Sequence, residues 1–112
     1  MKIIIAGAGE VGFHLAKLLS LESQDITLID NKKSNLIIAE NQLDIKIIEG
    51  DSSSISVLRE AEAEKADLVV SVTTSESINF TTCFIAKQLG SKKTIARISN
   101  DEIINSDLDF KS

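Results

Sequence analysis

Apolar and polar residues follow two patterns along the chain, and the first is a short, nearly continuous apolar run. Five such runs are rich in isoleucine, valine and leucine, which is typical of parallel strands that are buried on both faces. The predicted strands span residues 2–7, 25–30, 44–50, 66–73 and 93–99.

The second pattern places apolar residues three and four positions apart, as on one side of an amphipathic helix. Val11, Leu15, Leu18 and Leu19 form the stripe of the first helix that we expect to be buried. The predicted helices span residues 10–20, 32–40, 54–62 and 76–89, and a further helix is expected to begin over residues 101–105.

Residues at the helix ends support these bounds. The serine run at residues 52–54 precedes the third helix and supplies candidate N-caps, and Gly90 follows the fourth helix as its C-cap. Within the fourth helix, Cys83 lies among apolar residues that include Phe80 and Phe84. We therefore interpret Cys83 as a small buried side chain.

Strands that alternate with helices imply right-handed crossovers and a parallel sheet with helices on both faces. The predicted fold class is α/β, a doubly wound, Rossmann-like sheet truncated after about five strands. A complete sheet of this type needs one more strand after residues 101–105, and the remaining "DLDFKS" is too short and too polar to form it. We expect residues 1–112 to be a single domain and a fragment of a longer chain.

Composition limits the class of protein. The 112 residues are 43% apolar, which favours a packed domain, and no apolar run approaches the ~20 residues that a membrane span needs. The N-terminus lacks the apolar core of a signal peptide, so we expect a cytoplasmic protein that does not insert into the membrane. The net charge of −5 disfavours a nucleic-acid partner, because phosphates are bound by basic surfaces.

A glycine pattern follows the first predicted strand. Gly7, Gly9 and Gly12 match G-x-G-x-x-G between a strand and a helix, which is the context of a dinucleotide-binding turn. In that motif the first glycine allows a tight turn, the second leaves room for a diphosphate and the third lets the helix pack closely. The start of the helix adds free N–H groups and about half a positive charge, which favour an anion. The alternative is a turn whose glycines serve packing alone.

Asp30 is a second signal, because it ends the second predicted strand 23 positions after Gly7. An acidic residue about 20 positions after the glycines binds the adenosine ribose in Rossmann domains. Its carboxylate would accept from both ribose hydroxyls and repel the 2′-phosphate of NADP, although Lys32 and Lys33 could soften that repulsion. The alternative is an N-cap of the next helix, and both roles can hold together.

More polar residues follow the third and fourth predicted strands, and the carboxyl ends of parallel strands meet at one edge of a sheet. Asp51 and Ser52 would lie near the adenosine, with a turn and N-cap as the alternative. Thr73, Thr74 and Ser75 would lie beside the diphosphate, with capping of the fourth helix as the alternative.

Arg97 lies within the otherwise apolar fifth predicted strand. It must find a partner or reach the edge of the sheet, where a phosphate or an acidic neighbour would serve. His14 has no acid or nucleophile near it in sequence, and we interpret it as a surface or packing residue. Because no catalytic triad order, metal-ligand cluster or Lys–Tyr pair is visible, the sequence predicts a nucleotide-binding Rossmann domain without a reaction centre.

Several segments together resemble the N-terminal RCK (or KTN) domain of Trk-type potassium-uptake regulators, over residues 1 to about 105. They are "KIIIAGAGEVG", "ITLIDNK", "IIEGDSS", "ADLVVSVTTSESIN", which contains Asn79, and "KTIARIS". The resemblance implies a regulatory domain, not an enzyme, on the cytoplasmic face of a membrane potassium channel or transporter. It also implies homodimers that assemble into a ring. The cofactor half of an NAD-dependent dehydrogenase and a purely structural domain remain the alternative functions.

The resemblance further implies the ligand, which is NAD(H) or an adenine nucleotide such as ADP or ATP. Some members carry arginine at the position of Glu10, and a carboxylate there would repel a triphosphate and favour NAD(H) or ADP. The implied contacts are Gly7, Gly9, Glu10 and Val11 to the diphosphate, Asp30 and Asn31 to the ribose, Asp51 and Ser52 to the adenine, and Thr73 on the far side.

Overall fold

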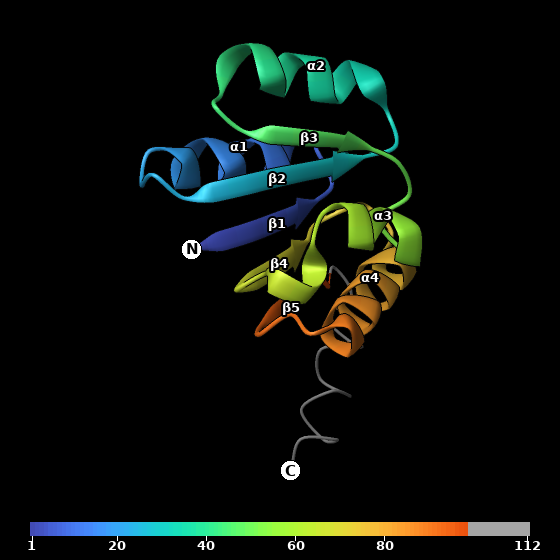
Figure 1. The fold of residues 1–112 in the computed structure, drawn as a ribbon. Helices are drawn as coiled ribbons and strands as arrows, with labels where there is room; N and C mark the ends of the chain where they lie inside the picture. Colours follow the sequence, from blue (N-terminus) through green and yellow to red (C-terminus); the bar gives the residue numbers. More distant parts are fainter. Residues whose placement is uncertain (99–112) are drawn as a thin grey trace.

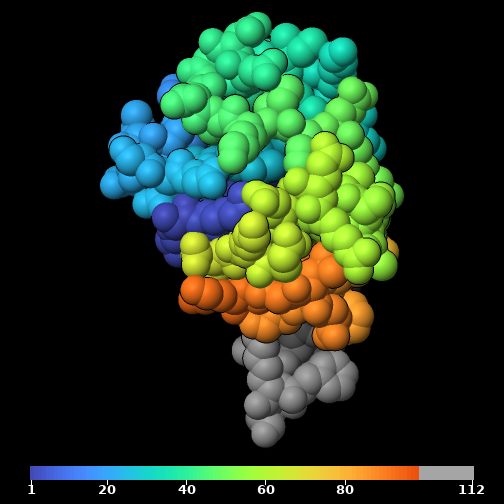
Figure 2. Space-filling view, in the orientation of Figure 1, coloured from blue at the N-terminus to red at the C-terminus, as the bar shows by residue number. Residues whose placement is uncertain are grey.

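The structure, a computed structural model, describes residues 1–98, so the helix expected over residues 101–105 lies outside the described residues. Within that range five parallel strands form one sheet in the order β3-β2-β1-β4-β5. The strands are β1 (Lys2–Ala6), β2 (Asp25–Asp30), β3 (Lys46–Glu49), β4 (Leu68–Ser71) and β5 (Thr94–Ala96). Figure 2 shows β1, in dark blue, between the light-blue β2 and the yellow region that leads into β4.

Helices cover both faces of this sheet (Figure 1). One face carries α1 (Glu10–Ser20) and α2 (Lys33–Gln42). The other face carries α3 (Ile55–Glu60), the 3₁₀ helix η1 (Ala63–Lys65) and α4 (Glu76–Leu89). The predicted α/β class with a doubly wound parallel sheet is confirmed. None of the helices within residues 1–98 is long and apolar enough to cross a bilayer.

The central strand β1 contributes to both halves of the core. Ile5 packs with Ala16 of α1 and Leu36 of α2, whereas Ile4 faces the opposite side and packs with Leu58 of α3. All five side chains are fully buried. Burying an isoleucine or leucine contributes about 1.5–3 kcal/mol, so the almost wholly apolar first strand anchors the sheet.

Several predicted bounds need correction. The helices α1 and α4 and the strand β2 begin and end where the sequence predicted, but the other four strands are shorter. The predicted third helix ends at Glu60, because Glu62 adopts the left-handed conformation with φ 62° and ψ 46°. Arg97 lies just after β5 rather than inside it.

The apolar stripe predicted for α1 was wrong at two of its four positions. Val11 and Leu18 of α1 are 45% and 63% exposed, and Gly12 and Ala16 are the fully buried positions of that helix. On α4, Phe80 and Phe84 are also exposed. Small residues replace large ones at the buried positions because α1 lies close against the sheet.

The end signals of the helices had mixed outcomes. Gly90 is the C-cap of α4, with φ 126° and N–H bonds to the carbonyls of Ala86 and Lys87, as predicted. Ser54 is the N-cap of α3 by position, but its side chain makes no capping bond and pairs with the Ser56 hydroxyl. Side-chain capping by the serine run was therefore a wrong prediction.

Candidate functional site

An open cavity of about 470 Å³ lies at the carboxyl edge of the sheet. The arrowheads of the strands point to this edge in Figure 1, where the connections after the strands meet. This volume falls within the range of small-molecule sites. All eleven residues predicted for the site line it, namely Gly7, Gly9, Glu10, Val11, Asp30, Asn31, Asp51, Ser52, Thr73, Thr74 and Arg97. That they bind a nucleotide stays a prediction.

Two glycines of the turn after β1 are required by the fold itself. Gly7 has φ +106°, a conformation that other residues rarely adopt, and its N–H donates to the carbonyl of Ile29 at 2.8 Å. At Gly12 an added Cβ would collide with the carbonyl oxygen of Gly7, so only glycine lets α1 pack against the turn.

Gly9 has no such reason to be glycine. Its backbone, with φ −72° and ψ −161°, suits any residue, and a Cβ added there would meet no protein atom within 4 Å. Gly9 lines the cavity, so the space beside it is open to a ligand. The alternative that all three glycines serve packing alone fails at this position.

The first turn of α1 offers backbone donors at the cavity. The N-cap is Gly9, which has no side chain to accept from the first N–H groups of the helix. The first bond of the helix runs from the N–H of Phe13 to the carbonyl of Gly9, at 2.9 Å. Within residues 1–98 no group accepts from the N–H groups of Glu10 and Val11, which both line the cavity. Unpaired N–H groups at a helix start attract anions.

The Asp30 carboxylate lies at the cavity wall and is already engaged. Its Oδ1 accepts from the N–H of Ala8 at 3.1 Å, and its Oδ2 accepts from the N–H of Lys32 at 3.0 Å and from Nδ2 of Asn35 at 3.1 Å. A carboxylate has about four acceptor positions, so about one stays free. Asp30 thus joins the glycine turn to the start of α2.

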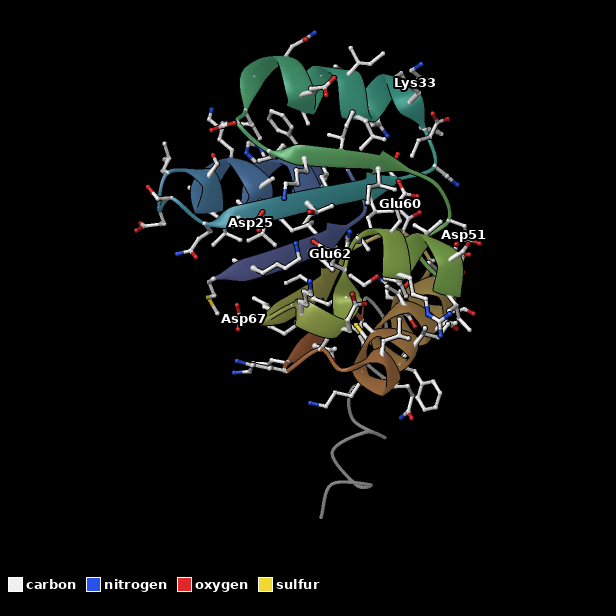
Figure 3. The ribbon with its side chains drawn as sticks, in the orientation of Figure 1. Asp25, Lys33, Asp51, Glu60, Glu62 and Asp67 are labelled. Carbon is white, nitrogen blue, oxygen red and sulfur yellow. The ribbon has the colours of Figure 1, made fainter. Side chains whose placement is uncertain are left out.

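This arrangement changes both roles considered for Asp30. Lys32, not Asp30, is the N-cap of α2, so the capping alternative was wrong as stated. Three acceptor positions of Asp30 are taken, so accepting from both ribose hydroxyls would require one of these bonds to be replaced. Lys32 lines the cavity beside Asp30, whereas the Lys33 side chain points away from it (Figure 3).

Asp51 and Ser52 lie after β3, where Figure 3 shows Asp51 at the carboxyl edge. Asp51 Oδ1 accepts from the hydroxyl of Ser53 at 2.7 Å and from its N–H at 2.9 Å. These bonds, chiefly the one from the hydroxyl, lower the pKa of Asp51 below its ordinary value of 3.8. Ser52 is 6% exposed, and its hydroxyl faces inward to Thr82 at 3.2 Å, so it is not free for a ligand.

The turn after β4 is also tied to the protein. Thr73 donates its N–H and its hydroxyl to Oδ1 of Asn79, at 3.0 and 2.7 Å. Ser75 is the N-cap of α4, and its hydroxyl oxygen accepts from the N–H of Ile78 at 3.2 Å. The capping alternative therefore holds for Ser75, and the Thr73 groups that we expected beside the diphosphate are already paired.

The structure settles the position of the remaining candidates. Arg97 reaches the edge as expected: its side chain is exposed and lines the cavity, and its N–H donates to the carbonyl of Ser71 at 2.9 Å. His14 is an exposed residue of α1 that packs edge-to-face with Phe13, as interpreted. Cys83 is 7% exposed, and burial raises the pKa of its thiol. No cluster of metal-ligating residues occurs within the part of the chain that the structure describes.

Sequence reasoning missed two polar residues that shape the site. Asn35 bonds to Asp30 from the first turn of α2, and its position five residues after the acid was the available signal. Asn79 lies on α4 and is 1% exposed; it was noted only as part of a motif. Its position three residues after the start of α4, close behind the threonine-rich turn, was the available signal in the sequence.

Comparison with known proteins identifies the family. The sequence profile of the TrkA-N domain matches residues 3–106. The chain belongs to the TrkA-N domain family. The resemblance predicted from the motifs is therefore confirmed.

Curated relatives agree with this TrkA-N assignment. The Trk system potassium uptake protein TrkA of Haemophilus influenzae is 46% identical over 105 residues, which is 93% of this chain and 23% of that protein. The Trk system potassium uptake protein TrkA homolog of Archaeoglobus fulgidus is 37% identical over 94% of this chain and 24% of that protein. The TrkA-N chain spans about a quarter of the length of these relatives.

Solved structures share the fold of this TrkA-N domain. The Kef CTD of Shewanella denitrificans in AMP-bound form matches with a TM-score of 0.71 at 25% identity, covering 85% of this chain and 57% of that one. The GsuK channel bound to NAD matches with a TM-score of 0.68 at 14% identity, covering 84% of this chain and 21% of that one. At such low identity the second likeness shows the fold alone.

Proposed function

We propose that this TrkA-N domain binds an adenosine nucleotide in the cavity and acts as a regulatory module of a potassium uptake system. The observation that carries the proposal is the open space beside Gly9, next to unpaired N–H groups at the start of α1. No packing requirement accounts for a glycine there, whereas a diphosphate approaching the backbone does. The AMP-bound Kef domain, at 25% identity, supports an adenosine ligand.

Each group of the cavity has a role in this proposal. The N–H groups of Glu10 and Val11 bind the diphosphate, with Gly7 holding the turn. The free acceptor position of Asp30 takes one ribose hydroxyl, and Asn31 lies beside it. The carboxylate of Asp51 borders the adenine end.

The far end of the cavity has its own groups. Thr73 and Thr74 line the wall after β4, and Arg97 supplies a positive charge after β5. Ser52 forms part of the opposite wall, and its hydroxyl is paired internally with that of Thr82. A dinucleotide extends across such an edge from one half of the sheet to the other, which favours a ligand that reaches both ends.

The charges of the wall favour NAD(H), or ADP, over ATP and NADP. Glu10 lies in the first turn of α1, where its carboxylate repels a third phosphate. The negative charge of Asp30 repels a 2′-phosphate, and Lys32 at the wall reduces that repulsion without removing it. NAD(H) adds no negative charge beyond the diphosphate.

Regulation requires that the ligand bind two arrangements of the protein with different affinities. A difference of about 5.5 kcal/mol suffices to invert a two-state population from 1:99 to 99:1. The relatives are named as potassium uptake proteins, which supports a membrane potassium channel or transporter as the partner. In this proposal the domain acts on the cytoplasmic side of that partner. Homodimers, or a ring of them, would transmit the change to that partner.

The relatives support binding rather than catalysis, because they are named as potassium uptake proteins. The alternative function is the cofactor half of an NAD-dependent dehydrogenase, whose acid–base residue would come from a substrate domain outside the described residues 1–98. A catalytic histidine or lysine in such a domain of the full-length protein would favour the dehydrogenase.

Calorimetric titration of the folded 112-residue chain tests the proposal. NADH, NAD, ADP, ATP and NADPH are titrated separately, and circular dichroism verifies that the sample is folded. We expect saturable one-to-one binding of NADH or ADP, with affinities at least about tenfold above those of ATP and NADPH, equivalent to ~1.4 kcal/mol. A folded sample that binds none of the five overturns the proposal.

A further inference from the structure

Two buried polar side chains of α4 lie behind the cavity without lining it. Asn79 is 1% exposed and Thr82 is fully buried, and neither belongs to the cavity wall. They lie three positions apart, on the same side of the helix. Buried polar groups are costly unless they are paired, so their partners show what they are for.

Asn79 holds the connections after β4 and β5. Its Oδ1 accepts from the hydroxyl of Ser71 at 2.9 Å and from the N–H and hydroxyl of Thr73 at 3.0 and 2.7 Å. Its Nδ2 donates to the carbonyls of Thr73 at 3.0 Å and of Arg97 at 3.1 Å. The amide thus fixes two lining residues that come from different strands.

Thr82 holds the connection after β3 instead. Its hydroxyl pairs at 3.2 Å with the hydroxyl of Ser52, which is a lining residue on the opposite side of the cavity from Arg97 in the sheet order. Ser52 is 6% exposed and Thr82 is fully buried, so this bond is largely shielded from bulk water. The helix α4 therefore contacts lining residues at both ends of the cavity. It uses one side chain, Thr82, at one end and another, Asn79, at the other end.

We propose that Asn79 and Thr82 are positioning residues through which α4 sets the two ends of the nucleotide site separately. The inference rests on the proposed function. Strands β1 to β3 build the adenosine half of a Rossmann site, and β4 begins the second half. Thr82 positions the adenosine end through Ser52, whereas Asn79 positions the second end through Thr73 and Arg97.

The two residues therefore differ in which ligands they affect. AMP occupies the adenosine half and one phosphate position, whereas NADH extends past the diphosphate to the second end. Asn79 consequently determines how strongly the site prefers a dinucleotide to a mononucleotide. Thr82 affects both ligands alike, because both place adenosine at the same end.

Paired titrations of variants of the full 112-residue chain test this division. The dissociation constants of AMP and NADH are measured for the wild type, Asn79→Ala and Thr82→Val. We expect Asn79→Ala to weaken NADH about tenfold and AMP less than about threefold, since several hydrogen bonds at one end are lost. We expect Thr82→Val to weaken both ligands by a similar factor of about three to five.

A milder variant guards against loss of folding. Ser71→Ala removes one donor to Asn79 from a fully buried residue that does not line the cavity, and we expect it to weaken NADH relative to AMP by about threefold. Equal weakening of both ligands by Asn79→Ala and Ser71→Ala would mean a purely structural role and overturn the inference. A wild type that binds neither nucleotide overturns the proposed function itself, and this inference with it.

Discussion

Gly9 and Gly12 separate two reasons for glycine that one sequence motif combines. Gly12 is glycine because a methyl group would collide with the carbonyl oxygen of Gly7, whereas Gly9 faces open space. The motif predicted that the third glycine serves packing and that the second leaves room for a diphosphate. The structure confirms the close packing at Gly12 and leaves Gly9 without a protein contact on its open side. This contrast makes a matched pair of alanine variants informative.

Gly9→Ala is expected to change the free energy of unfolding by less than about 0.5 kcal/mol, because the small loss at an N-cap is offset by a less flexible unfolded chain. It is expected to weaken NADH at least about tenfold, since the methyl group occupies the space of the diphosphate. Urea unfolding and calorimetric titration measure the two effects.

Gly12→Ala serves as the control and is expected to lower the free energy of unfolding by about 3 kcal/mol through overpacking. The interpretation of Gly9 fails if its alanine variant binds NADH as tightly as the wild type does.

The pKa of Asp51 provides a test at a second lining residue. Its folded-state pKa is lowered by Ser53, so the stability that this pair contributes is present above the ordinary pKa of 3.8 and is lost as the pH falls through the folded value. Ser53→Ala should move the Asp51 pKa back toward 3.8, as measured by NMR titration of the side-chain carboxyl.

Ser56→Ala is the matched control, because within residues 1–98 the Ser56 hydroxyl pairs with that of Ser54 and not with Asp51, and its loss should leave the Asp51 pKa unchanged. An Asp51 that titrates at or above its ordinary value in the wild type would contradict the hydrogen-bond geometry after β3.

Residues of the site were predictable where a motif names them and unpredictable where tertiary contacts decide. The glycine spacing and the position of Asp30 placed both at one edge of the sheet. The sequence could not show that Asp30 is engaged by Ala8 and Asn35, because those bonds depend on how the turn and α2 meet. For the same reason the inward-facing hydroxyl of Ser52 was not foreseen.

At the scale of elements, type and order were predictable because each strand is a nearly continuous apolar run, whereas the segments between the strands mix apolar with polar residues. Helix burial was less predictable: the apolar stripe of α1 suggested Val11 and Leu18, but close packing buries Gly12 and Ala16. The end of α3 was missed because a glutamate at residue 62 gives no sign of the left-handed conformation that it adopts.

The turn between α1 and β2 holds a second left-handed residue, Ser23, with φ 58°. Glycine adopts this conformation without the side-chain penalty, so Ser23→Gly is expected to raise the free energy of unfolding by about 0.5–1 kcal/mol. Chemical denaturation followed by circular dichroism measures the change.

The matched control is Ser34→Gly, an exposed serine in α2, which should lower stability by about 0.5 kcal/mol. If Ser23→Gly destabilises the chain as much as Ser34→Gly does, the left-handed turn is not formed in solution.

At the scale of the whole molecule, the two edges of the sheet differ in how their charges are used. At the amino edge, Lys2 lies within 3.6 Å of Asp25 and 3.4 Å of Glu62, and Lys92 lies 3.4 Å from Asp67. Figure 3 shows Asp25 and Asp67 at the side opposite to Asp51. These charges of the amino edge therefore pair with other protein groups, whereas the carboxyl edge keeps unpaired backbone donors for a ligand.

The most direct test of nucleotide binding at this edge is a ¹H–¹⁵N NMR titration of the 112-residue chain with NADH. Binding at the start of α1 predicts that the largest saturable shifts occur at the amides of Gly9, Glu10 and Val11, followed by those around Asp30, with little change near Asp25 at the amino edge. A well-dispersed spectrum that does not change with excess NADH, or whose shifts concentrate at the amino edge, would contradict it.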